Sequence, residues 1–265
     1  MLPPPVICFL INLDRSSQRL ADMRARLTAL AIDFTRIAAV DGASLDDAEF
    51  LRQTQKNRYY KPIRRGEVGC YLSHIKTLQS FLATSAPYAL ILEDDCEFHP
   101  GFLETFVSAI SLRDSSQDPL LQWDVLKLNR RRRRYIALAP LAADHLLVEY
   151  GLSVPITTAA AVWTRHAAQV FVQAYSGTSR PIDCDLQHPW EYGLKILSVH
   201  PPLIQQGGVA STIGDRKHGS HNALSKLAYE CKRLWPKLRQ FGRSYGWSFI
   251  AGWLWRQKLR FRNWQ

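Results

Sequence analysis

The sequence predicts an α/β fold in which helices flank a mixed sheet, and the first part of the chain carries the clearest signs of it. Val6 to Leu13 is apolar and rich in β-forming residues, and a second strand is expected from Phe34 to Val40, before the turn signal Asp41-Gly42. Between these strands, apolar residues recur at helical spacing, at Leu20, Met23, Leu27 and Leu30. Strand, helix and strand in this order are typical of a βαβ unit.

The alternation of helices and strands continues along the chain. A helix is expected to begin at Gly66-Glu67, and the apolar run YALIL from Tyr88 to Leu92 predicts a central strand. Further strands are predicted at 123–128, 146–150 and 196–200, and loops at 180–186 and 207–221. A small, apolar segment at 157–163 precedes a predicted helix at 165–175. A chain of 265 residues suits one large domain with an appendage.

Cysteine usage and hydropathy bound the class of protein. Five cysteines are scattered along the chain, an odd number, and none form a C-x-x-C pair. This pattern predicts a reducing compartment, with neither a disulfide framework nor a zinc knuckle. We interpret the segment before Val6 as the lead into the first strand rather than as a signal peptide, and no window approaches the ~18 apolar residues of a membrane-spanning helix.

The positive charge is concentrated in the last part of the chain. Residues 223–265 carry +9 of the net +11, together with five tryptophans. We therefore divide the chain into a domain at 1–222 and a tail at 223–265. An apolar stripe from Leu227 to Tyr245 predicts an amphipathic helix, which Pro236 should kink or split in two. Basic groups interleaved with aromatic rings favour attachment to an anionic membrane surface. A tail that packs on the domain is the alternative.

Three acids follow the predicted central strand directly: Glu93, Asp94 and Asp95. The carboxyl edge of an open α/β sheet is where ligands bind. Adjacent carboxylates repel one another unless a cation lies between them, and such oxygen ligands suit Mg²⁺ or Mn²⁺. A solvated acidic turn is the alternative, but the position after an apolar strand favours a metal site.

Several segments in this order resemble glycosyltransferase family 25, which includes bacterial lipooligosaccharide galactosyltransferases and the related collagen galactosyltransferases. They are INLDRSSQR (11–19), AVDG (39–42), RRGEVGCYLSH (64–74) and LILEDDCEF (90–98), with weaker blocks at 157–171 and 181–183. The resemblance implies a GT-A fold with a Rossmann-like sheet, a UDP-sugar donor, usually UDP-galactose, a Mn²⁺-type ion (or Mg²⁺), and inversion at the sugar carbon.

The resemblance also assigns roles to residues. Asp95 is our first choice as metal ligand and Asp94 our second, while Glu93 is a further ligand candidate that would face the ribose. A divalent ion there would stabilise the leaving UDP. Arginines and main-chain N–H groups near the end of the first strand favour phosphate. The predicted donor-binding set is Asn12, Arg15, Arg19, Asp41, Gly66, Glu67, Ser73, His74, Glu93 and Asp94.

An inverting transfer needs a general base that takes the proton of the acceptor hydroxyl. Asp183 and Asp185, in the predicted loop 180–186, are the catalytic candidates, and Asp183 matches the family block. Glu191 is an outside candidate, and loop acids that cap or solvate are the alternative for all three. His218 and His221 are considered for a late metal or diphosphate contact.

The expected acceptor is a lipooligosaccharide, lipopolysaccharide or other cell-surface glycan, reached from the cytoplasmic face of the membrane by a peripherally bound enzyme. The arginine run Arg130 to Arg134 suits acceptor phosphates, lipid headgroups or solvent alike. Two other classes stay open. A basic nucleic-acid-binding protein would account for the tail, although no nucleic acid is expected for a nearly neutral domain. A metal-dependent phosphohydrolase would account for the acids alone.

Overall fold

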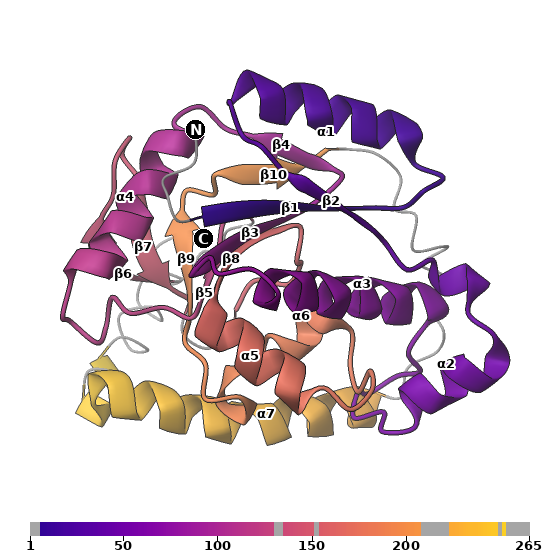
Figure 1. Cartoon of the computed structure of the whole chain (residues 1–265). Coiled ribbons are helices and arrows are strands. Elements are labelled where there is room, and N and C mark those ends of the chain that lie inside the picture. The colour runs from indigo at the N-terminus through magenta and orange to yellow at the C-terminus, as the bar shows by residue number, and fades with distance from the viewer. Residues whose placement is uncertain (1–5, 130–134, 151–153, 208–222, 249–250, 253–265) are drawn as a thin grey trace, which may run out of the picture.

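The computed structural model describes residues 6–129, 135–150, 154–207, 223–248 and 251–252. Its centre is an eight-stranded mixed sheet with the strand order β2-β1-β3-β8-β5-β9-β7-β6 (Figure 1). The strands are β1 (Val6–Asn12), β2 (Thr35–Ala38), β3 (Tyr88–Glu93), β5 (Val125–Lys127), β6 (Ile136–Pro140), β7 (Leu146–Glu149), β8 (Ala160–Thr164) and β9 (Ile196–His200). A second, two-stranded sheet pairs β4 (Cys96–Phe98) with β10 (Ile204–Gln206).

Helices cover both faces of the large sheet (Figure 1). On one face lie α1 (Ser17–Ala29) and α4 (Phe102–Ser115), whose apolar residues share a core with Leu90 and Leu92 of β3. On the other face, α3 (Arg65–Leu82) and α5 (Arg165–Ala174) pack on Ala89 and Ile91. Because successive side chains of a strand point to opposite faces, a strand covered on both sides is apolar throughout, as YALIL is.

The predicted fold class, an α/β fold with a mixed, Rossmann-like sheet flanked by helices, is confirmed. The opening βαβ unit is present, since β1 pairs in parallel with both β2 and β3. Four strands were not predicted, namely β4, β6, β8 and β10. The segment 180–186 was predicted as a loop and instead contains the short helix α6 (Ile182–Asp185), which precedes η2 (Pro189–Glu191). The remaining elements are η1 (Gly42–Ser44) and α2 (Asp47–Thr54).

The predicted division into two short helices at Pro236 is wrong, because α7 (Ala223–Tyr245) is one helix that contains Pro236. The alternative, a kink at this residue, stays a prediction. Proline removes a single helical hydrogen bond, and the carbonyl left free belongs to Lys232, which is exposed to water. Tertiary contacts offset the remaining cost. The helix packs against the domain through Lys237 and Phe241, which are 4% and 3% exposed. In the described part of the chain, no helix is long and apolar enough to cross a bilayer.

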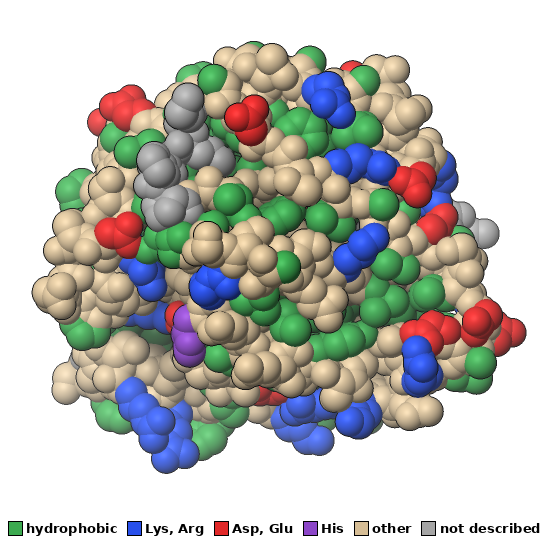
Figure 2. Space-filling view, in the orientation of Figure 1, with side chains coloured by type: hydrophobic (Ala, Val, Ile, Leu, Met, Phe, Trp, Pro, Cys, Tyr) green, Lys and Arg blue, Asp and Glu red, His purple; other side chains and the backbone are tan. Residues whose placement is uncertain are grey.

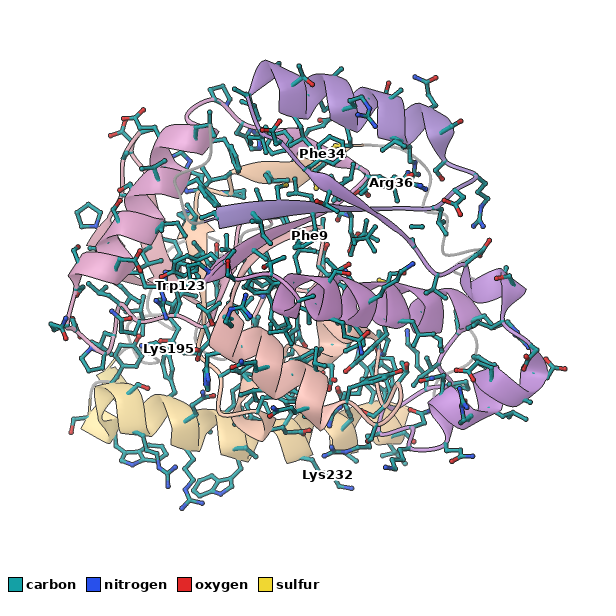
Figure 3. The ribbon with its side chains drawn as sticks, in the orientation of Figure 1. Phe9, Phe34, Arg36, Trp123, Lys195 and Lys232 are labelled. Atoms are coloured by element: carbon teal, nitrogen blue, oxygen red, sulfur yellow. The ribbon has the colours of Figure 1, made fainter. Side chains whose placement is uncertain are left out.

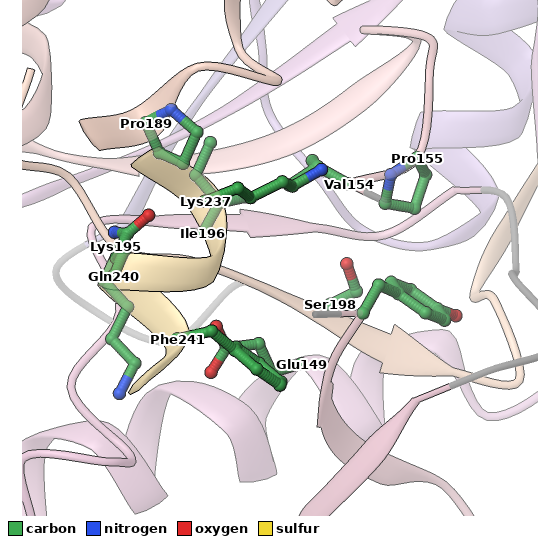
Figure 4. Close-up of a pocket in the computed structure, with 11 residues that line it drawn as sticks. Glu149, Val154, Pro155, Pro189, Lys195, Ile196, Ser198, Lys237, Gln240 and Phe241 are labelled. Atoms are coloured by element: carbon green, nitrogen blue, oxygen red, sulfur yellow. The ribbon is translucent and has the colours of Figure 1, made fainter. Parts of the chain in front are cut away.

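A small cavity marks the interface between α7 and the sheet (Figure 4). Its volume of about 20 Å³ is close to that of one water molecule. Lys237, Gln240 and Phe241 close it from α7, and the Tyr245 hydroxyl of the same helix donates to the Glu149 carboxylate at the end of β7. Burial raises the pKa of Glu149, so this contact is part of an enclosed polar interface. One side of α7 is therefore fixed to the domain.

Candidate active site

The carboxyl ends of β1 and β3 lie side by side and carry the candidate site. These strands are parallel neighbours, with Ile11 opposite Glu93. Asn12 ends β1, Glu93 ends β3, and Asp94 and Asp95 form the turn that follows. The predicted placement of the three acids at the carboxyl edge of the sheet is confirmed.

Asp94 faces α1 and is held on both carboxylate oxygens. The Asn12 amide donates to Oδ2 at 2.7 Å, and the Arg19 guanidinium donates to Oδ1 at 3.1 Å. Arg36 of β2, labelled in Figure 3, donates to Oδ1 of Asn12 at 3.1 Å and so fixes the orientation of that amide. Asn12 is only 1% exposed. The structure thus brings together three predicted donor-site residues, Asn12, Arg19 and Asp94.

Glu93 faces α3, because the strand alternation turns it away from Asp94. Its Oε1 lies 3.2 Å from Nε2 of His74 and accepts a hydrogen bond of 2.7 Å from the Thr158 hydroxyl. Burial alone would raise the pKa of Glu93. The hydrogen bond and charge of His74, the Thr158 hydroxyl and the charge of Lys127 together hold this pKa below its ordinary value. Glu93 is therefore an anion at neutral pH.

Asp95 has a carboxylate oxygen without a partner. Its Oδ2 accepts from the Gln206 amide at 3.0 Å, whereas its Oδ1 is buried and has no hydrogen bond within the described residues. Burial, reinforced by the charge of Glu93, raises the pKa of Asp95 to about 6. An unsatisfied buried carboxylate oxygen is costly. A divalent cation would satisfy it, so the residues present fit an Mg²⁺ or Mn²⁺ ion bound at Asp95.

A thiol also lies near Glu93. Ligand atoms of Cys70, His74 and Glu93 all lie within 4.8 Å of one another, with Cys70 and His74 one turn apart on α3. Burial and the negative charges of Glu93 and Asp183 raise the pKa of Cys70 well above its ordinary value. Thiolates suit soft metals such as zinc, whereas Mg²⁺ and Mn²⁺ prefer oxygen ligands. The carboxylate of Asp95 is the better candidate.

Other predicted donor-site residues hold the turn between β2 and α3. A Cβ atom at Gly69 would lie 2.5 Å from the Gly42 nitrogen, so only glycine allows this close approach of α3 to the turn. The Ser73 hydroxyl accepts from the Val40 amide at 2.8 Å, and Asp41 forms an ion pair with Arg15. Glu67 accepts from the Arg64 amide at 2.7 Å, which caps the helix.

These contacts give Glu67 and Ser73 structural roles at the start of α3. Gly66 occupies the second position of the same helix. Arg15 and Asp41 sit on the α1 side of this turn and are partly exposed. Donor contacts by any of these five residues stay a prediction, because the hydrogen bonds and the ion pair described for them form within the chain itself.

The two predicted catalytic acids differ sharply. Asp183 is the second residue of α6 and is half-buried, and its carboxylate accepts from the Cys184 amide at 2.7 Å and also contacts the Cys184 thiol. Its charge acts on Cys70, which places it near the Glu93 side of the site. Asp185, 1% exposed, pairs with Arg180 at 2.6 Å and accepts from Tyr71 and Tyr192, both at 2.7 Å.

The geometry therefore argues against Asp185 as a general base, because a buried carboxylate with every oxygen occupied cannot reach an acceptor hydroxyl. Glu191 is occupied in the same way by Arg58 and Arg180. His218, His221 and the run Arg130 to Arg134 lie outside the described residues.

Sequence reasoning missed four residues that shape the site: Arg36, Lys127, Thr158 and Gln206. Thr158 stands in the weaker family block at 157–171, and Lys127 lies in the predicted strand 123–128. The sequence therefore offered a reason to consider both residues. Lys127 is fully buried and donates to the Pro155 carbonyl at 2.6 Å. No sequence signal pointed to Gln206, because this residue reaches Asp95 only through the pairing of β10 with β4.

The profile of the family described as "Glycosyltransferase family 25 (LPS biosynthesis protein)" matches residues 6–185, more than half of the chain. The chain belongs to glycosyltransferase family 25. The match covers the edge acids, α3 and α6, and ends at Asp185. The resemblance seen in the sequence is confirmed, and family 25 membership favours a transferase over the nucleic-acid-binding and phosphohydrolase alternatives.

Curated relatives of this family 25 chain are larger proteins. A glycosyltransferase 25 family member of Anopheles gambiae and procollagen galactosyltransferase 2 of Homo sapiens are each 28% identical over 131 residues. These alignments cover 47% of this chain but 22% and 20% of the relatives, so the chain spans about a fifth of their length. A solved glycosyltransferase involved in glycosylation of the PBCV-1 major capsid matches with a TM-score of 0.38 and 9% identity, over 86% of this chain and 100% of that one. A likeness this low carries no argument.

Proposed function

We propose that the protein transfers a hexose, galactose by preference, from a UDP-sugar to a hydroxyl of a lipooligosaccharide, lipopolysaccharide or other cell-surface glycan, with inversion at the sugar carbon. The observation that carries the proposal is the unpartnered, buried Oδ1 of Asp95 at the carboxyl edge of β3 in a family 25 chain. A nucleotide diphosphate and its divalent ion need such an anionic ligand next to cationic and N–H groups.

The donor side of the reaction is assigned to the ends of β1 and β3. Asp95 would hold Mn²⁺ or Mg²⁺, with Asp94 as a second ligand, and the ion would neutralise charge on the departing UDP. Arg19 and Asn12 hold Asp94 in place and lie at the start of α1, where N–H groups attract phosphate. Glu93, fixed by His74 and Thr158, is positioned to accept hydrogen bonds from sugar or ribose hydroxyls.

The general base of the proposed reaction is Asp183. It lies on the α3 side of the site, and its hydrogen bonds within the described residues come from Cys184 alone. In the transfer, Asp183 takes the proton of the acceptor hydroxyl while that oxygen attacks the anomeric carbon. The bond from this carbon to the UDP oxygen breaks on the opposite face, which inverts the configuration.

The proposed location is the cytoplasmic face of a membrane, where the protein binds peripherally through its tail. Four large apolar side chains of α7 are exposed, between 46% and 72% each: Leu224, Leu227, Leu234 and Trp235. Lysines and arginines of the same helix gather along this lower edge of the molecule (Figure 2). An amphipathic helix of this kind suits an anionic surface. Flotation that is equal with anionic and neutral vesicles would argue against it.

The decisive test is calorimetric titration of UDP-galactose and UDP-glucose, with and without Mn²⁺, into the wild-type protein, an Asp95→Ala variant and an Asp33→Ala control. Asp33 is an exposed acid before β2, at the opposite edge of the sheet. We expect metal-dependent binding that Asp95→Ala abolishes and Asp33→Ala retains. If the folded wild-type protein binds neither nucleotide sugar with Mn²⁺ present, the transferase proposal fails.

A further inference from the structure

A second cavity, away from the edge acids, lies between α7 and the segment that carries α6 and η2. Its volume is about 450 Å³, large enough for a sugar or two. Four cationic side chains line it, Arg58, Arg180, Lys232 and Arg233, against one carboxylate, Glu191. Its ring-bearing walls come from His188, Trp190 and Tyr229. We call this cavity the α7 groove.

The α7 wall of the groove is one helical face. Tyr229, Lys232, Arg233 and Pro236 follow each other at steps of three, one and three residues, which brings them onto the same side of the helix. This face is distinct from the outer stripe of leucines, so α7 presents two different surfaces. Lys232, labelled in Figure 3, lies on the outer margin of the helix.

The positive charges in the groove exceed what their partners neutralise. Arg58 and Arg180 share Glu191, and Arg233 pairs with Glu230. Lys232 has no partner among the described residues. Arg180 is 3% exposed, and its Nε is buried without a hydrogen bond although Asp185 occupies the neighbouring nitrogen. A buried guanidinium N–H left open in a cationic pocket indicates an anionic or strongly accepting ligand.

The remaining walls suit a sugar ring and its hydroxyls. The His188 and Trp190 rings lie 5.1 Å apart, and Tyr229 meets His188 edge to face at 5.7 Å. Because the Cys184 carbonyl only accepts, Nδ1 of His188 donates to it at 2.9 Å. Burial and the charge of Arg180 lower the pKa of His188 to about 4, so its Nε2 is an acceptor at neutral pH. The Tyr229 hydroxyl is buried without a partner in the described chain.

The α7 groove is adjacent to the proposed general base through α6. Asp183 and Asp185 are two residues apart on this short helix, with Asp183 on the Cys70 side and Asp185 bound to Arg180 of the groove. Between them, the Cys184 thiol lies 3.6 Å from the Tyr59 hydroxyl, and the Tyr59 ring packs edge to face on Tyr229. The groove and the base therefore lie on the two sides of α6.

We propose that the α7 groove binds a phosphate or carboxylate group carried by a sugar of the acceptor. Lys232 and the Arg180 side chain supply positive charge to the anionic group, the aromatic rings pack against the sugar, and Nε2 of His188 accepts from a hydroxyl. That this sugar belongs to the acceptor rests on the proposed function, whereas the anionic-sugar site itself does not. It gives α7 a role in selecting the substrate besides its contact with a membrane.

The test is calorimetric titration of glucose 6-phosphate, glucuronate and uncharged glucose, with UDP and Mn²⁺ present at saturation so that the donor site is occupied. The variants are Lys232→Glu and Lys226→Glu, which reverse the same charge on the same exposed helix, inside and outside the groove. We expect both anionic sugars to bind at least tenfold more tightly than glucose. Lys232→Glu should weaken them about tenfold, and Lys226→Glu should not.

Each other outcome overturns the proposal. Equal binding of glucose and glucose 6-phosphate would remove the anionic specificity. Equal losses in the two variants would show a diffuse charge effect, and no loss in Lys232→Glu would place the ligand elsewhere. A lipid source is separated by vesicles of phosphatidylglycerol: if only these bind through Lys232, the groove holds a lipid headgroup. Titration of UDP alone reports separately on the donor site, so failure of either proposal is recognised on its own.

Discussion

Two acidic clusters lie within one small region of the molecule, and they differ in how completely their oxygens are occupied. In the edge cluster, Glu93, Asp94 and Asp95, one buried oxygen of Asp95 has no partner. In the α6 cluster, Asp185 and Glu191, every carboxylate oxygen accepts from arginine or tyrosine. Both clusters come from acidic residues in a family-matched stretch or just beyond it.

The difference distinguishes a structural acid from a functional one. An ion pair that is buried and fully hydrogen-bonded is self-contained, and it fixes the geometry of the chain around it. A buried carboxylate oxygen without a partner costs stability in the free protein, and it is retained where a ligand compensates for it. We therefore assign the α6 cluster to holding α6 and η2 in place, and the edge cluster to binding.

Removal of the Asp185 carboxylate should have the largest effect. Asp185→Ala leaves Arg180, Tyr71 and Tyr192 without their shared acceptor in a buried position, and we expect a loss of about 3–5 kcal/mol in the free energy of unfolding. Urea unfolding followed by circular dichroism measures it. Asp183→Ala, two residues away and half-buried, is the matched control and should cost less than about 1 kcal/mol. Equal small losses would end the distinction between the two aspartates.

Replacement of Asp183 should act on catalysis rather than on stability. Asp183→Asn keeps the shape and the contact from the Cys184 amide but cannot take a proton. We expect the turnover rate to fall about 100-fold or more, with UDP-sugar affinity unchanged. Initial rates with a glycan acceptor, alongside calorimetry, separate the two quantities. Full turnover in a folded Asp183→Asn protein would transfer the role of base to another group.

The fold and the edge cluster were predictable because their signals are local. A strand buried on both faces must be apolar throughout, and three acids directly after it must lie at its carboxyl end. Ser73 was also recognised, although for a donor-binding role, and Gly69 lies in the same family-like segment. Their observed role is close packing against the turn at Gly42, which only the folded chain brings within reach.

What could not be predicted depends on contacts between residues far apart in sequence. The sequence favoured Asp183 over Asp185 only through the family block, and the full occupation of the Asp185 carboxylate depends in part on Tyr71, a residue 114 positions away. The tail also depends on such contacts. The periodic stripe identified an amphipathic helix, but it could not show that Lys237 and Phe241 are the residues that pack on the domain. Leu227 and Leu234, which the stripe placed together, are exposed.

The smallest expected effect is on the pH dependence of stability in the metal-free protein, and it comes from the edge cluster. Burial raises the pKa of Asp95 in the folded protein to about 6, above its ordinary value of 3.8. Between these values the folded state holds the proton more tightly than the unfolded state, so the stability due to protonated Asp95 is present below pH 4 and lost as the pH rises through 6. Asp95→Asn carries no such charge. In EDTA its melting temperature should match wild type near pH 4 and exceed it by a few degrees at pH 7.5.

Addition of Mn²⁺ at pH 7.5 should raise the melting temperature of the wild-type protein and leave Asp95→Asn unchanged, because the ion compensates for the charge that the variant lacks. Asp94→Asn is the matched control. It loses the contact from Arg19 rather than an open oxygen, so in EDTA it should be less stable than wild type at pH 7.5. If Asp95→Asn were destabilised in the same way, Asp95 would be a structural acid like Asp185, and the contrast between the two clusters would not hold.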